Sequence, residues 1–78
     1  MTRPDDIDEV DRAVGARLAA YRSARRLSEQ RLADLAEISV EELRAIERGA
    51  SKVYASTLYL LSAALGAPVA DLIRRPLH

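Results

Sequence analysis

Cysteine, tryptophan and phenylalanine are absent from this 78-residue chain. Without cysteine, the protein has no disulfide framework, no thiol nucleophile and no cysteine-based metal site. No run of 18 apolar residues occurs, and the N-terminal residues are acidic. We therefore expect no membrane span and no basic signal peptide, and we predict a cytoplasmic protein.

Side-chain groups that typically carry catalysis or hold metal ions are missing as well. The single histidine, His78, is the last residue. Glu41 and Glu42 are neighbours in a predicted helix, so their side chains diverge by about 100° and do not converge on one substrate. No glycine-rich phosphate loop is present. We therefore predict that the protein is not an enzyme and has no cofactor and no metal site.

Net charge is also lacking, because 12 basic residues balance 12 acidic ones. A strong non-specific DNA binder would be basic overall. The charges are nevertheless segregated along the chain. Residues 1–11 hold five acids against one arginine, residues 12–28 hold five arginines and no acid, and residues 29–48 hold six acids against three arginines. Positive charge is thus concentrated on one predicted segment.

Apolar residues recur at helical spacing through most of the chain. The stripe Ile7, Val10, Val14, Leu18 and Tyr21 repeats at intervals of three and four, which predicts a helix over about 6–25. Asp6 and Glu9 resemble a capping box at its start. We expect one all-α domain over residues 6–75, preceded by a flexible arm at residues 1–5.

Two serines predict the starts of two short helices. Ser28 is a good N-cap for a helix over about 29–36, and Ser39 with Glu42 forms a capping box for a helix over about 40–48. Gly49 fits the left-handed position after the second helix. The predicted inward residues of the two helices are Leu32, Ala33, Leu35, Ala36, Leu43 and Ile46.

Two more helices complete the prediction. The first covers about 55–65, with Leu58, Leu61, Ala64 and Leu65 inward and Gly66 at its end. The second covers about 68–74, with Pro68 in its first turn and with Val69, Leu72 and Ile73 as its apolar residues. The short pair at 29–36 and 40–48, joined by a tight turn, has the spacing of a DNA-reading helix-turn-helix.

From residue 14 to residue 73 the chain resembles the Cro/CI-type helix-turn-helix proteins, also called the xenobiotic-response-element family. The resemblance is carried by the segments VGARLAAYRSARRLS, LADLAEIS, IERG and LSAALGAPVADLI. It implies a five-helix lambda-repressor-like domain in which the helix at 40–48 enters the major groove of double-stranded DNA. It also implies a bacterial transcriptional regulator, expected to act as a homodimer.

The resemblance assigns roles to individual positions. The family usually has glutamine where this chain has Glu29, and its turn glycine is replaced here by Glu37. Arg22 and Glu47 match a pair that joins the first and third helices. The positions implied to contact DNA are Glu29, Gln30, Arg31, Ser39, Val40, Glu41, Arg44, Ala45, Arg48, Ser51 and Lys52.

Other readings of the same residues stay open. Acids at positions 29, 37, 41 and 42 suit a helix-turn-helix that has become a protein-interaction module, and some relatives are antitoxins of toxin–antitoxin pairs. An apolar surface large enough for a dimer or for another protein partner is predicted from Val53, Tyr54, Tyr59, Leu60 and Leu77. Arg44 is the strongest single candidate for base contact, and its alternative role is an ion pair within its own helix.

Overall fold

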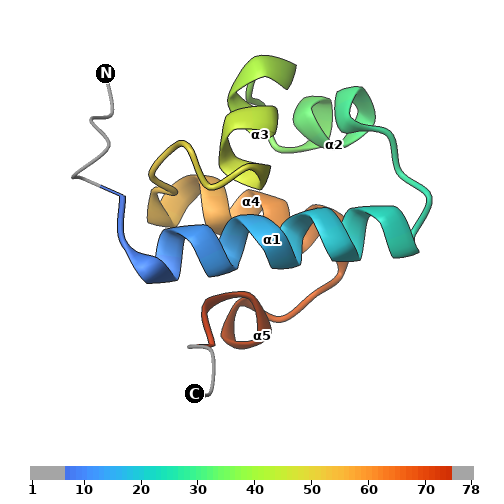
Figure 1. The fold of residues 1–78 in the computed structure, drawn as a ribbon. Helices are drawn as coiled ribbons and strands as arrows, with labels where there is room; N and C mark the ends of the chain where they lie inside the picture. Colours follow the sequence, from blue (N-terminus) through green and yellow to red (C-terminus); the bar gives the residue numbers. More distant parts are fainter. Residues whose placement is uncertain (1–6, 75–78) are drawn as a thin grey trace.

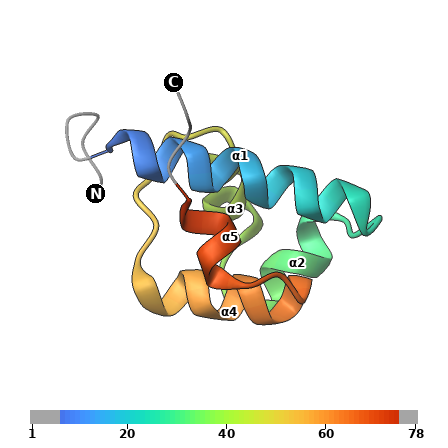
Figure 2. The same cartoon turned by 90° about the horizontal axis from the view of Figure 1, so that it is seen from below.

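The computed structural model describes residues 7–74, which form five α-helices (Figure 1). Their bounds are α1 (Glu9–Ala24), α2 (Glu29–Leu35), α3 (Val40–Glu47), α4 (Ala55–Leu65) and α5 (Val69–Ile73). The long α1 lies between the α2–α3 pair on one side and α5 on the other. In the view from below, α1 and α4 lie on opposite sides of the molecule, and α5 lies between them and nearer the viewer (Figure 2). The all-α fold class is confirmed.

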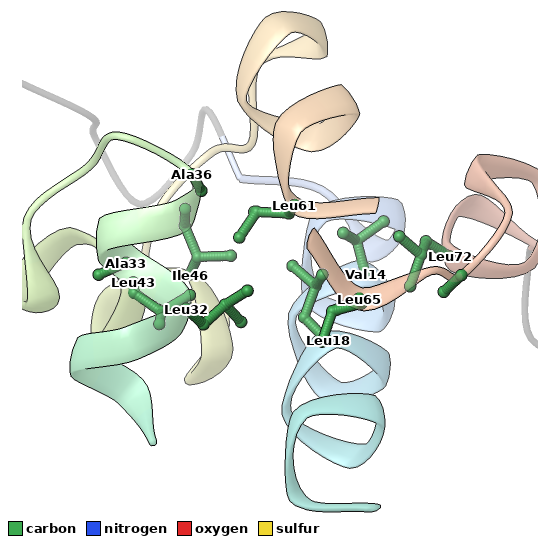
Figure 3. Packing of buried hydrophobic residues seen from close by; sticks show 11 residues of the cluster. Val14, Leu18, Leu32, Ala33, Ala36, Leu43, Ile46, Leu61, Leu65 and Leu72 are labelled. Carbon is green, nitrogen blue, oxygen red and sulfur yellow. The ribbon is translucent and has the colours of Figure 1, made fainter. Parts of the chain in front are cut away.

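A single apolar core is shared by all five helices. Leu18, Leu32, Leu43, Leu61 and Leu72, one from each helix, are fully buried. Figure 3 shows these side chains converging on one interior together with Val14, Ile46 and Leu65. Burying a leucine side chain stabilises the fold by about 1.5–3 kcal/mol. A small domain without large aromatic side chains therefore gains its core from many close aliphatic contacts.

Gly15 brings the first and third helices unusually close together. This residue of α1 is buried, and a Cβ placed on it would collide with the carbonyl oxygen of Ile46 on α3. Glycine costs a helix about 1 kcal/mol relative to alanine. Here glycine permits backbone-to-backbone contact between α1 and α3, which no larger residue would allow.

The first four helices end in the same way, with a left-handed residue after the last turn. Gly49 and Gly66 occupy this conformation at φ 71° and 64°, as predicted. Arg26 and Glu37 occupy it at φ 57° and 61° without being glycine. After α2, Ile38 N–H donates to Ala33 O and Glu37 N–H donates to Asp34 O, which satisfies the last carbonyls of the helix.

Several predicted boundaries and contacts are wrong in detail. Helix α1 begins after Asp8 rather than Asp6, because Asp8 and Asp11 form the reciprocal capping box. Pro68 is the N-cap of α5 rather than part of its first turn. Leu35, predicted as an inward residue, is exposed, and so is Ile73, one of the apolar residues of the last helix. The helix ends at 24, 35, 47 and 73 each lie one residue before the predicted end.

The arm predicted at residues 1–5 lies outside the described residues. Within residues 7–74, none of the helices is long and apolar enough to cross a lipid bilayer.

Candidate nucleic-acid interface

The turn between α2 and α3 is set by local capping and by the buried face of each helix. The Ser28 hydroxyl accepts a hydrogen bond from Arg31 N–H at 3.0 Å, and the Ser39 hydroxyl accepts one from Glu42 N–H at 3.0 Å. Both serines are therefore the predicted N-caps. Because Leu43 and Ile46 point into the core, the opposite side of α3 faces outward.

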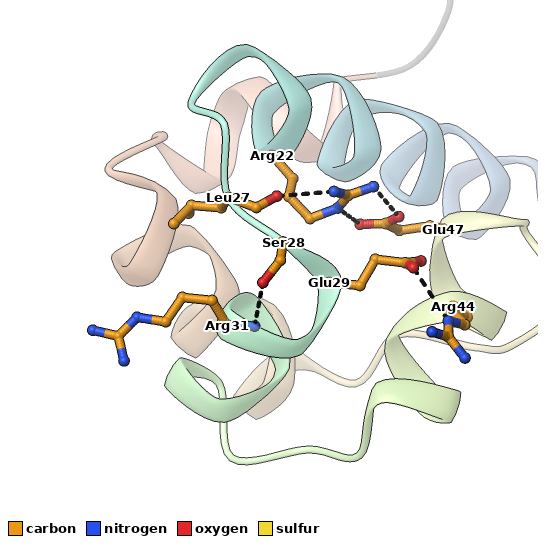
Figure 4. A network of polar contacts seen from close by, with 7 residues as sticks. All are labelled: Arg22, Leu27, Ser28, Glu29, Arg31, Arg44 and Glu47. Atoms are coloured by element: carbon orange, nitrogen blue, oxygen red, sulfur yellow. Dashed lines mark hydrogen bonds and ion pairs between the residues drawn. The ribbon is translucent and has the colours of Figure 1, made fainter.

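An ion pair fixes α3 to α1 on its inner side. Arg22 Nε and Nη2 donate to the two carboxylate oxygens of Glu47 at 2.8 and 3.1 Å, and Arg22 Nη1 donates to Leu27 O at 2.9 Å. The two side chains are only 18% and 8% exposed. The hydrogen bonding of Arg22 to the Glu47 carboxylate is the main cause that raises the pKa of Arg22. This pair contacts α1, α3 and the connection to α2, so its role is to hold α3 in place (Figure 4).

The outer face of α3 carries charged, solvent-exposed side chains. Glu41, Arg44 and Arg48 lie at helical intervals of three and four and are exposed, and Glu42 is exposed beside them. Ala45 is half-buried between them. Val40 is also half-buried but packs against the core, so only part of its surface is available for contact with another molecule.

A second ion pair joins α2 to this outer face. Arg44 Nε donates to Glu29 Oε1 at 3.2 Å, and the side chains are 51% and 33% exposed (Figure 4). The alternative role expected for Arg44, a pair within its own helix, is therefore not what the structure shows. Its carboxylate partner comes instead from the first residue of the preceding helix.

The remaining predicted contact residues lie around this face. The Gln30 amide donates to Asp34 within α2 at 2.9 Å, so its donor is engaged. Arg31 is exposed, and its guanidinium points away from Glu29 and Arg44 (Figure 4). In the loop after α3, Lys52 is exposed and Ser51 is half-buried, with the Ser51 hydroxyl donating to Lys52 O.

Asp11 holds that loop in place, a role that could not be predicted from the sequence. One carboxylate oxygen of Asp11 accepts from Val53 N–H at 3.1 Å across 42 residues of sequence, and the other accepts from Asp8 N–H. Asp11 is buried. A hydrogen bond between residues so far apart leaves no local pattern, so only the position of Asp11 at N3 of a capping box was open to prediction.

Residues 18–72 match the helix-turn-helix family HTH_3. The chain belongs to the helix-turn-helix family. As a member of it, the protein is a DNA-binding transcription regulator, in agreement with the regulators that it resembles in structure. The resemblance to the Cro/CI-type proteins is thereby confirmed.

Solved structures of three bacterial regulators are similar to this helix-turn-helix protein. The clp gene regulator ClgR from Corynebacterium glutamicum has a TM-score of 0.80 and 32% identity, over 85% of this chain and 70% of that one. The restriction-modification controller C.AhdI from Aeromonas hydrophila has a TM-score of 0.76 and 29% identity, over 80% and 94% of the two chains. The competence regulator ComR from Streptococcus vestibularis has a TM-score of 0.75 and 31% identity, over 82% and 22%. Among curated proteins, none matches the sequence.

The structure exposes only some residues of the predicted partner surface of this helix-turn-helix regulator. Tyr54 and Tyr59 are 60% and 67% exposed. Val53 and Leu60 are half-buried and pack against the core, so they support this surface from below rather than form it. Leu77 lies outside the described residues. From residue 53 to residue 70 the sequence contains no charged side chain.

Proposed function

We propose that the protein binds double-stranded DNA sequence-specifically, as a homodimer, with α3 of each subunit in the major groove. The observation that carries this proposal is the outer face of α3. It presents Glu41, Arg44 and Arg48 on a helix whose opposite face is fixed in the core. A helix fits the major groove, where each base pair displays a distinct pattern of donors and acceptors.

The mixed charge of this face favours base reading over phosphate binding. Arg44 offers donors to a guanine, and a carboxylate such as Glu41 can accept a hydrogen bond from cytosine N4. Phosphate contacts are left to the neighbouring segments, where Arg31 of α2 and Lys52 of the loop after α3 are exposed. With few cations and nearby acids, binding should weaken with salt less steeply than for a basic regulator.

The uncharged surface of α4 supports the homodimer. In a chain with 31% charged residues, Tyr54 and Tyr59 stand exposed within an 18-residue segment that has none. A surface without charge meets a second copy of itself without repulsion, and exposed tyrosines are favoured at interfaces. Two-fold symmetry would place the half-sites one helical turn, roughly 34 Å, apart.

A regulator of bacterial genes works where the chromosome is, so the proposal places the protein in the cytoplasm. It also requires no cofactor, because the outer face of α3 is built from side chains of the chain itself.

Binding of the purified protein to fragmented genomic DNA across a salt series tests the proposal, with recovery and sequencing of the bound fragments. Enrichment of a palindromic site would support it, and the salt slope would count the phosphate contacts. Arg44→Ala should weaken specific binding by about 1–3 kcal/mol. Arg74→Ala is the matched control, because Arg74 is exposed next to α5, on the other side of α1 from α3. Absence of any binding at low salt would overturn the DNA-reading role and favour a protein partner.

The dimer is tested separately by sedimentation of the free protein. Tyr59→Glu should shift the population toward monomer, and Ala20→Glu, a charge added at an exposed position of α1, should not. An unchanged sedimentation coefficient for Tyr59→Glu would remove α4 as the interface.

A further inference from the structure

The ion pair between Glu29 and Arg44 engages only one edge of the arginine. Arg44 Nε of α3 donates its hydrogen bond to Glu29 Oε1 of α2. Among residues 7–74, neither Nη1 nor Nη2 of Arg44 has a hydrogen-bond partner, and the side chain is half exposed. Figure 4 shows the terminal nitrogens of Arg44 turned away from the carboxylate. The end of the guanidinium is thus left for another molecule.

The free edge has a definite chemical complement. The two terminal nitrogens of a guanidinium form a planar fork, which pairs with two acceptors side by side. In the major groove, guanine presents such a pair in O6 and N7, and arginine on guanine is the commonest specific contact. A guanidinium whose Nε is engaged by the protein can still make this contact in full.

Glu29 also lies close enough to a second cation, Arg22, to interact with it electrostatically. It contributes, after Glu47, to raising the pKa of Arg22, which shows that its carboxylate also lies within the field of the buried pair. Arg22 is fixed by Glu47 and by Leu27 O. An acid close to both a fixed arginine and a surface arginine keeps the surface arginine near one position and lowers the entropy that Arg44 would lose on binding.

The same carboxylate reduces the attraction of Arg44 for phosphates. An unpaired surface arginine is drawn to any phosphate within reach, whatever the sequence. With Glu29 beside it, the Arg44 charge is largely balanced, so the remaining gain comes from hydrogen bonds of the correct geometry. The Glu29–Arg44 pair therefore lowers the affinity for DNA of any sequence and increases the discrimination among bases.

From this geometry we propose that Glu29 is a positioning residue, which does not itself touch DNA but directs the terminal nitrogens of Arg44 to one guanine in each half-site. The inference rests on the proposed function, since it requires that α3 enter the major groove. The family resemblance implied that the residue at position 29 anchors phosphate and supports the third helix; here Glu29 is assigned to the orientation of one side chain, Arg44, and not to phosphate.

Measurement of side-chain motion tests the positioning role without DNA. The order parameter of the Arg44 Nε–H group should be high in the wild type and should fall in Glu29→Ala. Arg48, exposed at the end of α3, is the internal reference and should be mobile in both proteins. Equal mobility of Arg44 and Arg48 in the wild type would overturn the proposal even if the protein binds DNA.

Discrimination among bases tests the reading role. On the recovered site, replacing one particular guanine of each half-site should weaken the wild type about 10-fold or more and Arg44→Ala hardly at all. In Glu29→Ala the penalty for that replacement should fall several-fold, while binding to unrelated DNA strengthens. Glu29→Gln keeps a hydrogen-bond acceptor and should retain most of the penalty.

Glu42→Ala is the control for charge, because it removes an exposed acid of α3 that is not among the predicted DNA contacts. If Glu42→Ala and Glu29→Ala lose the guanine penalty equally, the effect is general electrostatics and the positioning role fails. If Glu29→Ala keeps the full penalty for replacement of the guanine, the positioning role fails as well. A wild type that binds no DNA but shows a rigid Arg44 would overturn the proposed function alone and leave Glu29 as the residue that positions this arginine.

Discussion

The two faces of α3 are built on opposite principles. On the inner face, Arg22 and Glu47 form a two-bonded ion pair that is shielded from water, and Ile46 meets α1 directly at Gly15. On the outer face, Arg44 and Glu29 share a single hydrogen bond in solvent. The residue types are the same in both pairs, yet burial differs widely. Shielding makes the loss of one partner of the first pair strongly destabilising, while exposure makes the second pair contribute little to stability and leaves the end of Arg44 accessible to a ligand.

The largest effect is expected from removing the close approach on the inner face. Gly15→Ala places a methyl group against the Ile46 carbonyl, so α1 and α3 must separate. Overpacking typically costs 1–3 kcal/mol, and contact with backbone puts this case at about 3 kcal/mol or more, well above the helix-propensity gain. Chemical denaturation measures it. Ala16→Gly, at an exposed neighbouring position, should cost only about 1 kcal/mol. A Gly15→Ala protein as stable as the wild type would disprove the contact.

The two ion pairs should then respond very differently to the same substitution. Glu47→Gln leaves Arg22 with an uncompensated, mostly buried charge and should lower stability by about 2–3 kcal/mol. Glu29→Gln removes the exposed acid and should change stability by roughly 0.2–1 kcal/mol. Denaturation midpoints of the two variants compare them directly. Equal losses would mean that burial does not separate the two pairs.

A smaller effect is expected at the turn that connects α2 to α3. Glu37 is left-handed at φ 61°, a conformation that costs an L-residue roughly 1–2 kcal/mol but glycine little. After the entropy that glycine loses on folding, Glu37→Gly should raise stability by about 0.5–1 kcal/mol, seen as a higher melting temperature. Gly66→Ala is the reverse exchange at φ 64°, with open space around the added methyl, and should lower stability by a similar amount. If Glu37→Gly and Gly66→Ala change stability in the same direction, the backbone conformation at these two helix ends does not determine their effect.

The smallest effect concerns pH and the start of α1, far from either ion pair. The hydrogen bond from Asp11 N–H is the first cause that lowers the pKa of Asp8 below its ordinary 3.8. Asp8 therefore contributes stability above that value, and the contribution is lost as the pH falls through the lower folded pKa. The difference in stability between the wild type and Asp8→Ala should shrink as the pH falls from about 5 through 3.8 and further into the acid range. A constant difference over that range would contradict the cap.

The inner face could be predicted from sequence far better than the outer one. Leu43 and Ile46 follow helical spacing, and the serine caps and the glycines at helix ends act within a few residues, so local rules were sufficient. The prediction that Leu35 points inward was wrong, because a seven-residue helix buries only one narrow stripe. Ala33 and Ala36 already occupy that stripe. Asp8 displaced Asp6 as the cap because two acids at suitable spacing are available at the same helix start.

The contacts that define the candidate interface join residues that are distant in sequence. Glu29 and Arg44 are 15 residues apart and meet only because the turn folds α3 back across α2. The sequence could name both as candidates but could not show that they bind each other. Asp11 with Val53 is the stronger example, since the bond joins the first helix to a loop beyond the third.

The contact at Gly15 also determines whether the protein or the DNA duplex changes shape when the protein binds DNA. Because α1 and α3 touch backbone to backbone, the reading helix is set before any duplex arrives and has little freedom left to lose. In the proposed homodimer, a reading helix that is fixed within each subunit leaves more of the adjustment to the duplex, which bends or twists into register. The base pairs between the half-sites, untouched by the protein, would then be selected for how easily they deform.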